Sequence, residues 1–346
     1  MSNIKNLISN NQSIWLDSIS KQMLDSGDLS KIIDLGITGI TSNPSIFDKA
    51  ISSSEVYDET IREISNNISD PKGVFEELAI RDIQRASDLL FKIYKKSEGT
   101  DGFVSLEVDP FLANNTEETI KEAKRLWNRV NRENLMIKVP GTDLGFPAIQ
   151  HLLESGININ ITLLFSFDSY KKCLQAFLQS QKTNTSSKSV ASFFISRIDT
   201  AVDMNLENSN KIFHKIGIAN SFKAFGHYLN SKKIMKNNYQ KLLWASTSVK
   251  AEDLDPAYYC ENLPISGTIN TLPLETINDL LKKEDFKINK LKISETYSEI
   301  MEDLDKILDL NLITQELLLN GIKLFQDSYS SVLETVNKKI KSIKKK

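Results

Sequence analysis

The sequence is poor in several residue types, and each shortage excludes a class of protein. Only two of its 346 residues are cysteine, which is too few for the disulfide framework of a small secreted protein. The three histidines, His151, His214 and His227, are scattered without the spacing of metal ligands, so we expect no metal site. No run of about 18 apolar residues occurs, and the first residues lack a signal-peptide core, so we expect a cytoplasmic protein without membrane segments.

Charge of one sign is also lacking. The chain has 43 Lys and Arg against 45 Asp and Glu, a formal net charge of -2, so we expect no nucleic-acid partner. Residues 338–346 are the exception, because lysine dominates there. We favour a frayed, solvated helix end for this tail over a nucleic-acid or membrane patch.

Short apolar segments alternate with amphipathic segments of helical length. Eight segments are predicted as strands: 14–17, 39–42, 102–109, 135–140, 157–165, 189–198, 241–246 and 258–263. Strand–helix alternation implies parallel pairing, and eight units predict a closed (β/α)8 TIM barrel in one domain. A doubly wound sheet is the rival fold, but the Gly-rich loop that usually follows its first strand is missing.

Helix signals agree with this division of the chain. We expect Asp28 to cap a helix over 29–35, Asn43 to precede a helix that starts with Pro44, and one long helix over 74–94. The barrel should occupy about residues 12–285. Residues 291–346 are helical in pattern and are expected to pack on the outside of the barrel.

The segment 135–140, Leu-Met-Ile-Lys-Val-Pro, carries one lysine, Lys138, in an otherwise apolar strand. Burial disfavours the charged form of a lysine, and a neutral amine is a nucleophile that can form a Schiff base with a carbonyl substrate. Taken alone, the segment also fits an edge strand with a solvated lysine.

Polar residues recur at every second position in the two segments that flank this strand. They are Ser105, Glu107 and Asp109 on one side and Asn158, Asn160 and Thr162 on the other. Helices cover the outside of a closed barrel, so we expect these polar faces to point into the lumen. Lys138 would then lie beside Glu107 and Thr162, which could relay the protons of carbinolamine chemistry, with a water between them.

Three other residues at strand ends have two interpretations each. Asp17 could be the base that starts carbon–carbon cleavage or a helix N-cap, and Asn43 has the same ambiguity. Arg197 could bind a phosphate or pair with a carboxylate outside the barrel.

Four motifs, in this order, resemble those of the transaldolase family. They are Thr-Ser-Asn-Pro-Ser at 41–45, Leu-Met-Ile-Lys-Val-Pro at 135–140, Gly-Ile-Asn-Ile-Asn-Ile-Thr-Leu-Leu-Phe-Ser at 156–166 and Leu-Trp-Ala-Ser-Thr-Ser at 243–248. The resemblance extends from about residue 15 to about residue 328 and is strongest to the longer bacterial subfamily.

This resemblance implies a class I aldolase-type barrel that needs no cofactor. It implies transfer of a dihydroxyacetone unit between sugar phosphates in the nonoxidative pentose phosphate pathway. Sedoheptulose 7-phosphate and glyceraldehyde 3-phosphate would interconvert with erythrose 4-phosphate and fructose 6-phosphate.

The resemblance also implies catalytic roles. Lys138 matches the Schiff-base lysine, and Asp17 matches the acid/base of carbon–carbon cleavage. Glu107 and Thr162 match the pair that holds the catalytic water.

Binding roles follow in the same way. The positions that match ligands of the dihydroxyacetone hydroxyls are Asn43, Asn160 and Ser192. Arg197 and Ser246 match phosphate-binding positions. Many transaldolases have a second phosphate-binding arginine shortly after this serine, and here Lys250 is the nearest cation, at a different spacing.

Two alternative functions remain. Fructose 6-phosphate aldolases share the barrel and the lysine but tend to have Gln and Tyr where this chain has Glu107 and Phe194. A non-catalytic sugar-phosphate-binding barrel would need Arg197 but not Lys138, Glu107 and Asp17 together. We expect a monomer or a homodimer.

Overall fold

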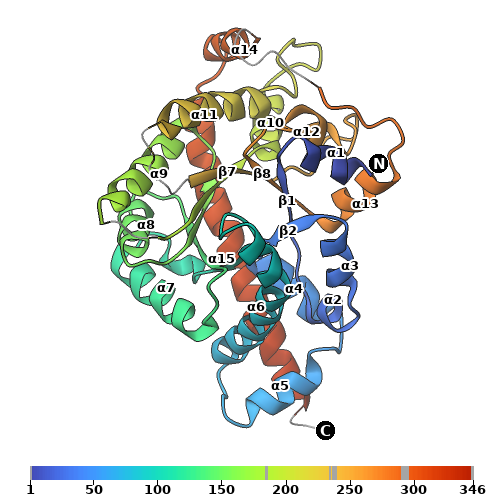
Figure 1. The fold of residues 1–346 in the computed structure, drawn as a ribbon, viewed down its shortest axis with the longest axis vertical. Helices are drawn as coiled ribbons and strands as arrows, with labels where there is room; N and C mark the ends of the chain where they lie inside the picture. The colour runs from blue at the N-terminus through green and yellow to red at the C-terminus, as the bar shows by residue number, and fades with distance from the viewer. Residues whose placement is uncertain (1, 184–185, 234, 236–239, 290–295, 344–346) are drawn as a thin grey trace.

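The computed structural model describes residues 2–183, 186–233, 235, 240–289 and 296–343. Eight parallel strands form a closed barrel in which each strand pairs with the next and the last pairs with the first, which confirms the predicted (β/α)8 fold (Figure 1). The strands are β1 Ser13–Leu16, β2 Ile37–Ile40, β3 Val104–Glu107, β4 Leu135–Pro140, β5 Ile159–Leu164, β6 Ser189–Phe194, β7 Gln240–Ala245 and β8 Ile269–Leu272.

Helices connect and surround the strands (Figure 1). Before β3 they are α1 Asn3–Ser9, α2 Lys21–Asp25, α3 Asp28–Asp34, α4 Pro44–Ser52, α5 Asp58–Ser65 and α6 Pro71–Lys96. From β3 to β7 they are η1 Pro110–Leu112, α7 Thr116–Val130, α8 Gly145–Glu154, α9 Phe167–Ser180, η2 Gln181–Thr183, α10 Ser196–Asp203 and α11 Ile216–Lys232. The remaining helices are α12 Tyr258–Asn262, α13 Leu274–Lys282, α14 Thr296–Asp305 and α15 Leu310–Ile343.

The prediction of the eighth strand was wrong. Residues 258–263 mostly form the short helix α12, which buries Tyr259 and Cys260, whereas β8 lies at Ile269–Leu272. A short apolar run does not distinguish a buried strand from a buried turn of helix. The better signal was the pair of breakers around β8, because Gly267 has a φ of +79° and Pro273 follows the strand.

The helix signals near the N-terminus were mostly right. Asn43 caps α4, accepting a hydrogen bond from the Ile46 amide, and the long helix is α6. Asp28 does not cap α3: the carboxylate pairs with Ser26 and Lys31, and the helix begins within the chain reversal at Gly27, where φ is +75°.

The C-terminal helices pack on the outer helices of the barrel, as predicted, although residues 291–295 and 344–346 lie outside the described residues. α14 packs on α11, and α15 packs on α4, α5, α6 and α10. The prediction did not include the contact of α15 with β5. In Figure 1, α15 crosses the barrel from the α10 side to the α5 side. Residues 338–343 form the end of this helix, and Lys338 and Lys341 are exposed, as expected of a solvated helix end. This part is not frayed, because Ile340 is buried and Lys339 is bonded to Asp58 at 2.5 Å.

Strand alternation divides the buried residues into two layers. The side chains that face the helices are almost all aliphatic, as Leu135, Ile137 and Val139 of β4 illustrate. Those that face the lumen change along the strands: Trp15, Met136 and Ile269 fill the amino-terminal half, and polar residues follow towards the carboxyl ends. The lumen is therefore filled by apolar side chains at its amino-terminal end and lined by polar side chains at its carboxyl end.

The closed end depends on one large ring. The Trp15 indole is fully buried and donates to the Asp101 carboxylate at 2.9 Å. Trp15 pairs with Gly39 of β2, and a Cβ at Gly39 would collide with the indole. A glycine at this strand position leaves the space that the ring occupies.

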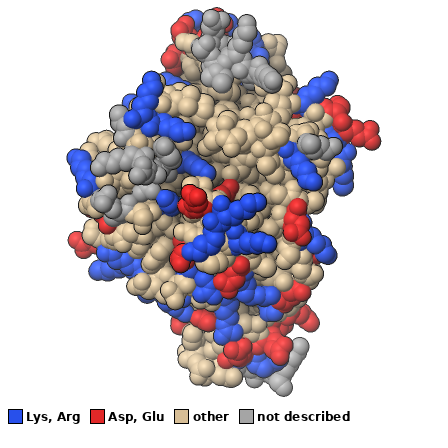
Figure 2. Space-filling view, viewed as in Figure 1, with Lys and Arg blue, Asp and Glu red and all other residues tan. Residues whose placement is uncertain are grey.

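Surface charges of both signs lie intermixed on the face drawn in Figure 2. Among the described residues, no helix is long and apolar enough to cross a membrane.

We expect Gly39→Ala to lower the free energy of unfolding by about 1–3 kcal/mol, the usual effect of overpacking a core. Chemical denaturation measures this change. The control is Gly226→Ala, because Gly226 lies within α11 and a Cβ there meets nothing within 4 Å; it should stabilise the protein by about 0.5–1 kcal/mol. Equal effects of the two substitutions would contradict the packing argument.

Candidate active site

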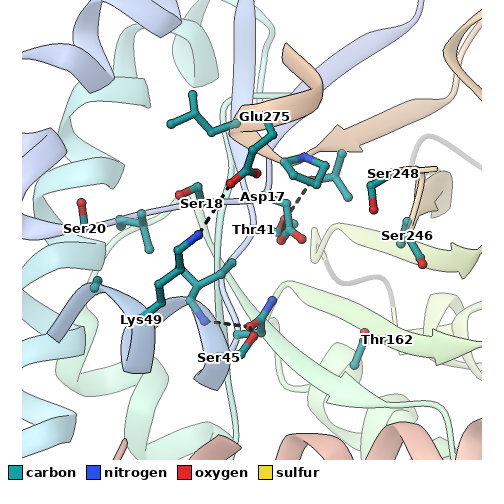
Figure 3. Close-up of a pocket in the computed structure, with 18 of the residues that line it drawn as sticks. Asp17, Ser18, Ser20, Thr41, Ser45, Lys49, Thr162, Ser246, Ser248 and Glu275 are labelled. Carbon is teal, nitrogen blue, oxygen red and sulfur yellow. Dashed lines mark hydrogen bonds and ion pairs between the residues drawn. The ribbon is translucent and has the colours of Figure 1, made fainter. Parts of the chain in front are cut away.

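A cavity of about 510 Å³ opens at the carboxyl ends of the strands, the end at which barrel enzymes carry their sites. Nine of the eleven residues singled out in the sequence line it: Asp17, Asn43, Lys138, Thr162, Ser192, Phe194, Arg197, Ser246 and Lys250. Glu107 and Asn160 do not line the cavity but contact residues that do. Figure 3 shows Asp17 and Thr41 side by side in this cavity, with Ser246 and Ser248 away from Lys49.

Lys138 lies on a central strand. Its strand, β4, pairs with β3 and β5 and is buried along its whole length, so the interpretation as an exposed edge strand is wrong. The lysine itself is 5% exposed. Its Nζ donates to the Ser42 carbonyl at 3.0 Å and lies 3.2 Å from a carboxylate oxygen of Glu107.

Glu107 is positioned by strand register, because it pairs directly with Lys138 across β3 and β4. Burial raises the pKa of its carboxyl group to about 7, and the nearby Lys138 partly opposes this shift. The group can therefore both accept and donate a proton near neutral pH. Apart from the ion pair with Lys138, neither its carboxylate oxygens nor the Thr162 hydroxyl has a hydrogen-bond partner among the described residues.

Asn160 connects three strands below the cavity. Its amide donates to the Ser105 hydroxyl at 3.0 Å, and its carbonyl oxygen accepts from the Ser192 hydroxyl at 2.7 Å. Ser105, Asn160 and Ser192 are all buried, so this network fixes the lumen-facing side chains of β3, β5 and β6.

Asp17 follows the end of β1. Its carboxylate accepts from the Thr41 hydroxyl at 2.6 Å, and Thr41 is 2.8 Å from the Thr271 hydroxyl. The helix that follows is capped by Ser20, so the N-cap interpretation of Asp17 is wrong. Asn43, by contrast, satisfies both interpretations, because it caps α4 and also lines the cavity.

Arg197 lies in the first turn of α10, directly after β6. Its guanidinium carbon is 5.5 Å from the centre of the Phe194 ring. Burial lowers the pKa of Arg197, and the Asp17 charge opposes this. No carboxylate of the described residues forms an ion pair with Arg197, so pairing outside the barrel does not explain it.

The loop after β7 adds hydroxyl groups and a cation. Ser246 has a left-handed backbone with φ of +53°, and its hydroxyl is 3.0 Å from that of Ser196. Lys250 lines the same cavity, and its Nζ donates to the Ser248 hydroxyl at 2.9 Å.

Sequence reasoning missed several cavity residues, among them Thr41, Thr271, Lys49, Glu275 and Phe325. Lys49 of α4 and Glu275 of α13 form an exposed ion pair at 3.6 Å (Figure 3). Phe325 comes from α15, and its ring centre is 5.6 Å from the Nζ of Lys138. Alternation along β8 could have identified Thr271, but helical periodicity cannot tell where α15 docks.

Comparisons with known proteins agree on one family. Residues 14–336 match the sequence model of the family described as transaldolase/fructose-6-phosphate aldolase. A protein from Trichodesmium erythraeum named transaldolase is 34% identical, with 96% of each chain covered. One from Nostoc sp. named transaldolase 2 is 36% identical, covering 95% of each chain. One from Thiobacillus denitrificans named transaldolase is 37% identical, covering 94% of this chain and 97% of the relative.

We expect Glu107→Gln to change how stability depends on pH. Burial raises the pKa of Glu107 from 4.5 to about 7 in the folded protein. The folded state therefore binds this proton more tightly than the unfolded state, and the resulting gain in stability is complete below pH 4.5 and is lost as pH rises through about 7. The wild type should therefore lose stability relative to Glu107→Gln across this range. Urea unfolding below, within and above it measures the difference.

The control for this comparison is Glu275→Gln, since the Glu275 side chain is 75% exposed. A difference between wild type and Glu107→Gln that stays constant with pH would show that Glu107 titrates alike in the folded and unfolded chain.

Proposed function

Because the chain belongs to the transaldolase/fructose-6-phosphate aldolase family, we propose that it acts through a Schiff base on Lys138. The activity is that of a transaldolase, the name that the reported relatives carry. In this proposal a dihydroxyacetone unit passes between sugar phosphates in the nonoxidative pentose phosphate pathway. The observation that carries the proposal is a lysine on a buried strand, paired with Glu107 and opening onto a cavity.

The first step is attack of the Lys138 amine on the ketose carbonyl. Glu107 is the group next to the lysine that can take up and return protons near neutral pH. With the Thr162 hydroxyl it would hold the water through which the carbinolamine loses its hydroxyl group. The free hydrogen-bonding capacity of Glu107 and Thr162 supports this role.

The second step breaks the bond between C3 and C4 of the sugar. Asp17 would remove the proton of the C4 hydroxyl, the aldose phosphate would leave as an aldehyde, and the bonding electrons would pass into the imine to give an enamine. Transfer to a second aldehyde reverses these events. The hydrogen bond from Thr41 keeps the Asp17 carboxylate directed at the cavity.

The remaining cavity residues would bind the substrate. We assign Asn43, Asn160 and Ser192 to the dihydroxyacetone hydroxyls. Arg197 and Ser246 would hold the phosphate, with Lys250 as a second cation on the same cavity wall.

Transfer is favoured over the free cleavage that an aldolase performs, because this chain has Glu107 and Phe194 where fructose 6-phosphate aldolases tend to have Gln and Tyr. A barrel that only bound sugar phosphates would not explain why Lys138 and Glu107 lie buried together.

We treat the barrel and the C-terminal helices, residues 1–346, as one functional unit because α15 contributes to the cavity. A cytoplasmic location and a monomeric or homodimeric state remain predictions. Two free, buried cysteines suit a reducing compartment.

Borohydride reduction in the presence of fructose 6-phosphate should leave a dihydroxyacetone adduct on Lys138, which peptide mass spectrometry would locate. We expect Lys138→Ala and Lys138→Arg to give no adduct and no turnover while remaining folded, because neither side chain can form the imine. The matched control is Lys241→Arg: Lys241 is also a barrel lysine that donates to a backbone carbonyl, that of Thr100. Transfer by either Lys138 variant would refute the mechanism.

Asp17→Ala should separate imine formation from cleavage. Borohydride should still trap an adduct on Lys138, but as the uncleaved fructose 6-phosphate imine, while release of glyceraldehyde 3-phosphate slows by about 10²–10⁴-fold, the usual loss for an acid/base group. Asp17→Asn, which keeps the shape of the side chain, should show the same separation. Unchanged cleavage in both variants would exclude Asp17 as the base.

A further inference from the structure

The long C-terminal helix α15 brings an aromatic ring to the reactive lysine. The ring of Phe325 is 8% exposed, lines the cavity, and has its centre 5.6 Å from the Nζ of Lys138. The other lining residues come from the barrel strands and from the loops and helices that follow them, up to α13. Phe325 is therefore an addition to the barrel's own site.

Close approach of α15 to the barrel places the ring there. Gly321, one turn before Phe325, lies against Leu163, and a Cβ on this glycine would be 2.9 Å from the leucine side chain. Leu163 has a φ of +60° at an irregularity in the pairing of β5 with β6. A left-handed backbone is unfavourable for a leucine, so surrounding packing must hold it.

Contacts on the other side of Phe325 hold the helix in place. Tyr329 packs edge-on against Phe75 at 5.7 Å. Ser331 and Thr335 both donate to the Asp48 carboxylate of α4, at 2.6 and 3.0 Å. The Phe325 ring is consequently fixed between two docking regions of one helix.

Phe325 belongs to an apolar cluster that contains further aromatic rings. Phe165 and Phe194 have ring centres 5.0 Å apart, and both are in the same buried cluster as Phe325. A cluster of this kind excludes water from the groups that it covers.

We infer that Phe325 is a specificity-determining residue that protects the covalent intermediate from hydrolysis. This inference rests on the proposed Schiff-base mechanism. In the unwanted reaction, C3 of the enamine gains a proton, water adds to the imine carbon, and the carbon–nitrogen bond breaks to give free dihydroxyacetone and the Lys138 amine. The ring lies beside the lysine and keeps solvent from C3 of the enamine, whose protonation the normal transfer does not need, so the intermediate persists until an aldehyde acceptor arrives. The water held by Glu107 and Thr162 can still form and hydrolyse the ketose imines of the normal reaction.

The test compares dihydroxyacetone release with transfer. Each protein is given fructose 6-phosphate alone and then with erythrose 4-phosphate, and free dihydroxyacetone and sedoheptulose 7-phosphate are measured. Phe325→Ala should raise the ratio of release to transfer about tenfold, as a relative change in barriers of about 1.4 kcal/mol would do. Phe325→Leu keeps an apolar side chain over the lysine and should stay near the wild-type ratio.

The matched control is Leu324→Ala, because Leu324 is the neighbouring residue on the same helix and is 52% exposed; its ratio should be unchanged. If Phe325→Ala does not fold, Phe325→Val carries the same expectation. An unchanged ratio in the smaller variants, or equal release by Phe325→Leu and Phe325→Ala, would overturn the inference.

The two proposals fail in different ways. Absence of a Lys138 adduct and of transfer in the wild type would refute the proposed function. A wild type that forms the adduct and transfers normally, together with an unchanged ratio in Phe325→Ala, would refute only the role of Phe325.

Discussion

The burial of an ion pair between neighbouring strands constrains the rest of this structure. Lys138 and Glu107 face each other across β4 and β3 with side chains that are 6% and 8% exposed. Two ionisable groups removed from water are stable only when partners surround them. The Ser42 carbonyl, the position of both strands inside a closed sheet and the polar lining of the cavity supply that environment. The same environment gives the carboxyl group a pKa of about 7.

The two halves of the lumen differ in composition: the amino-terminal half is a packed core, and the carboxyl-terminal half is polar. The amino-terminal half is filled by Trp15 and its apolar neighbours, with Gly39 providing the space. Because this half is packed tightly, the other half can contain hydroxyls, amides and charges that face a cavity instead of a packed core. A strand in this barrel therefore changes function along its length, as Trp15 and Asp17 of one segment show.

Local sequence patterns predicted correctly which strand residues face the lumen, because alternation along a strand determines this. Alternation with a period of two placed Lys138, Glu107, Asn160 and Thr162 on the lumen face before the register was known. The eighth strand was missed because four residues carry little periodicity, and the run at 258–263 was equally apolar. The position of α15 could not be predicted, since Gly321 and Phe325 reveal their partners only when Leu163 adopts its left-handed backbone in the folded barrel. Lys49 and Glu275 were missed for the same reason, because they meet through tertiary packing alone.

The position of Phe325 late in the chain has a consequence for biosynthesis. A ribosome makes all eight strands of the barrel before it makes any of α15, and nascent chains fold from the N-terminus onward. The strands that carry Lys138, Glu107 and Asp17 can thus fold together before Phe325 of α15 is in place. The contacts of α15 with Asp48 and Asp58 form after the barrel strands have been made, so the cavity gains its last wall only once α15 has been synthesised.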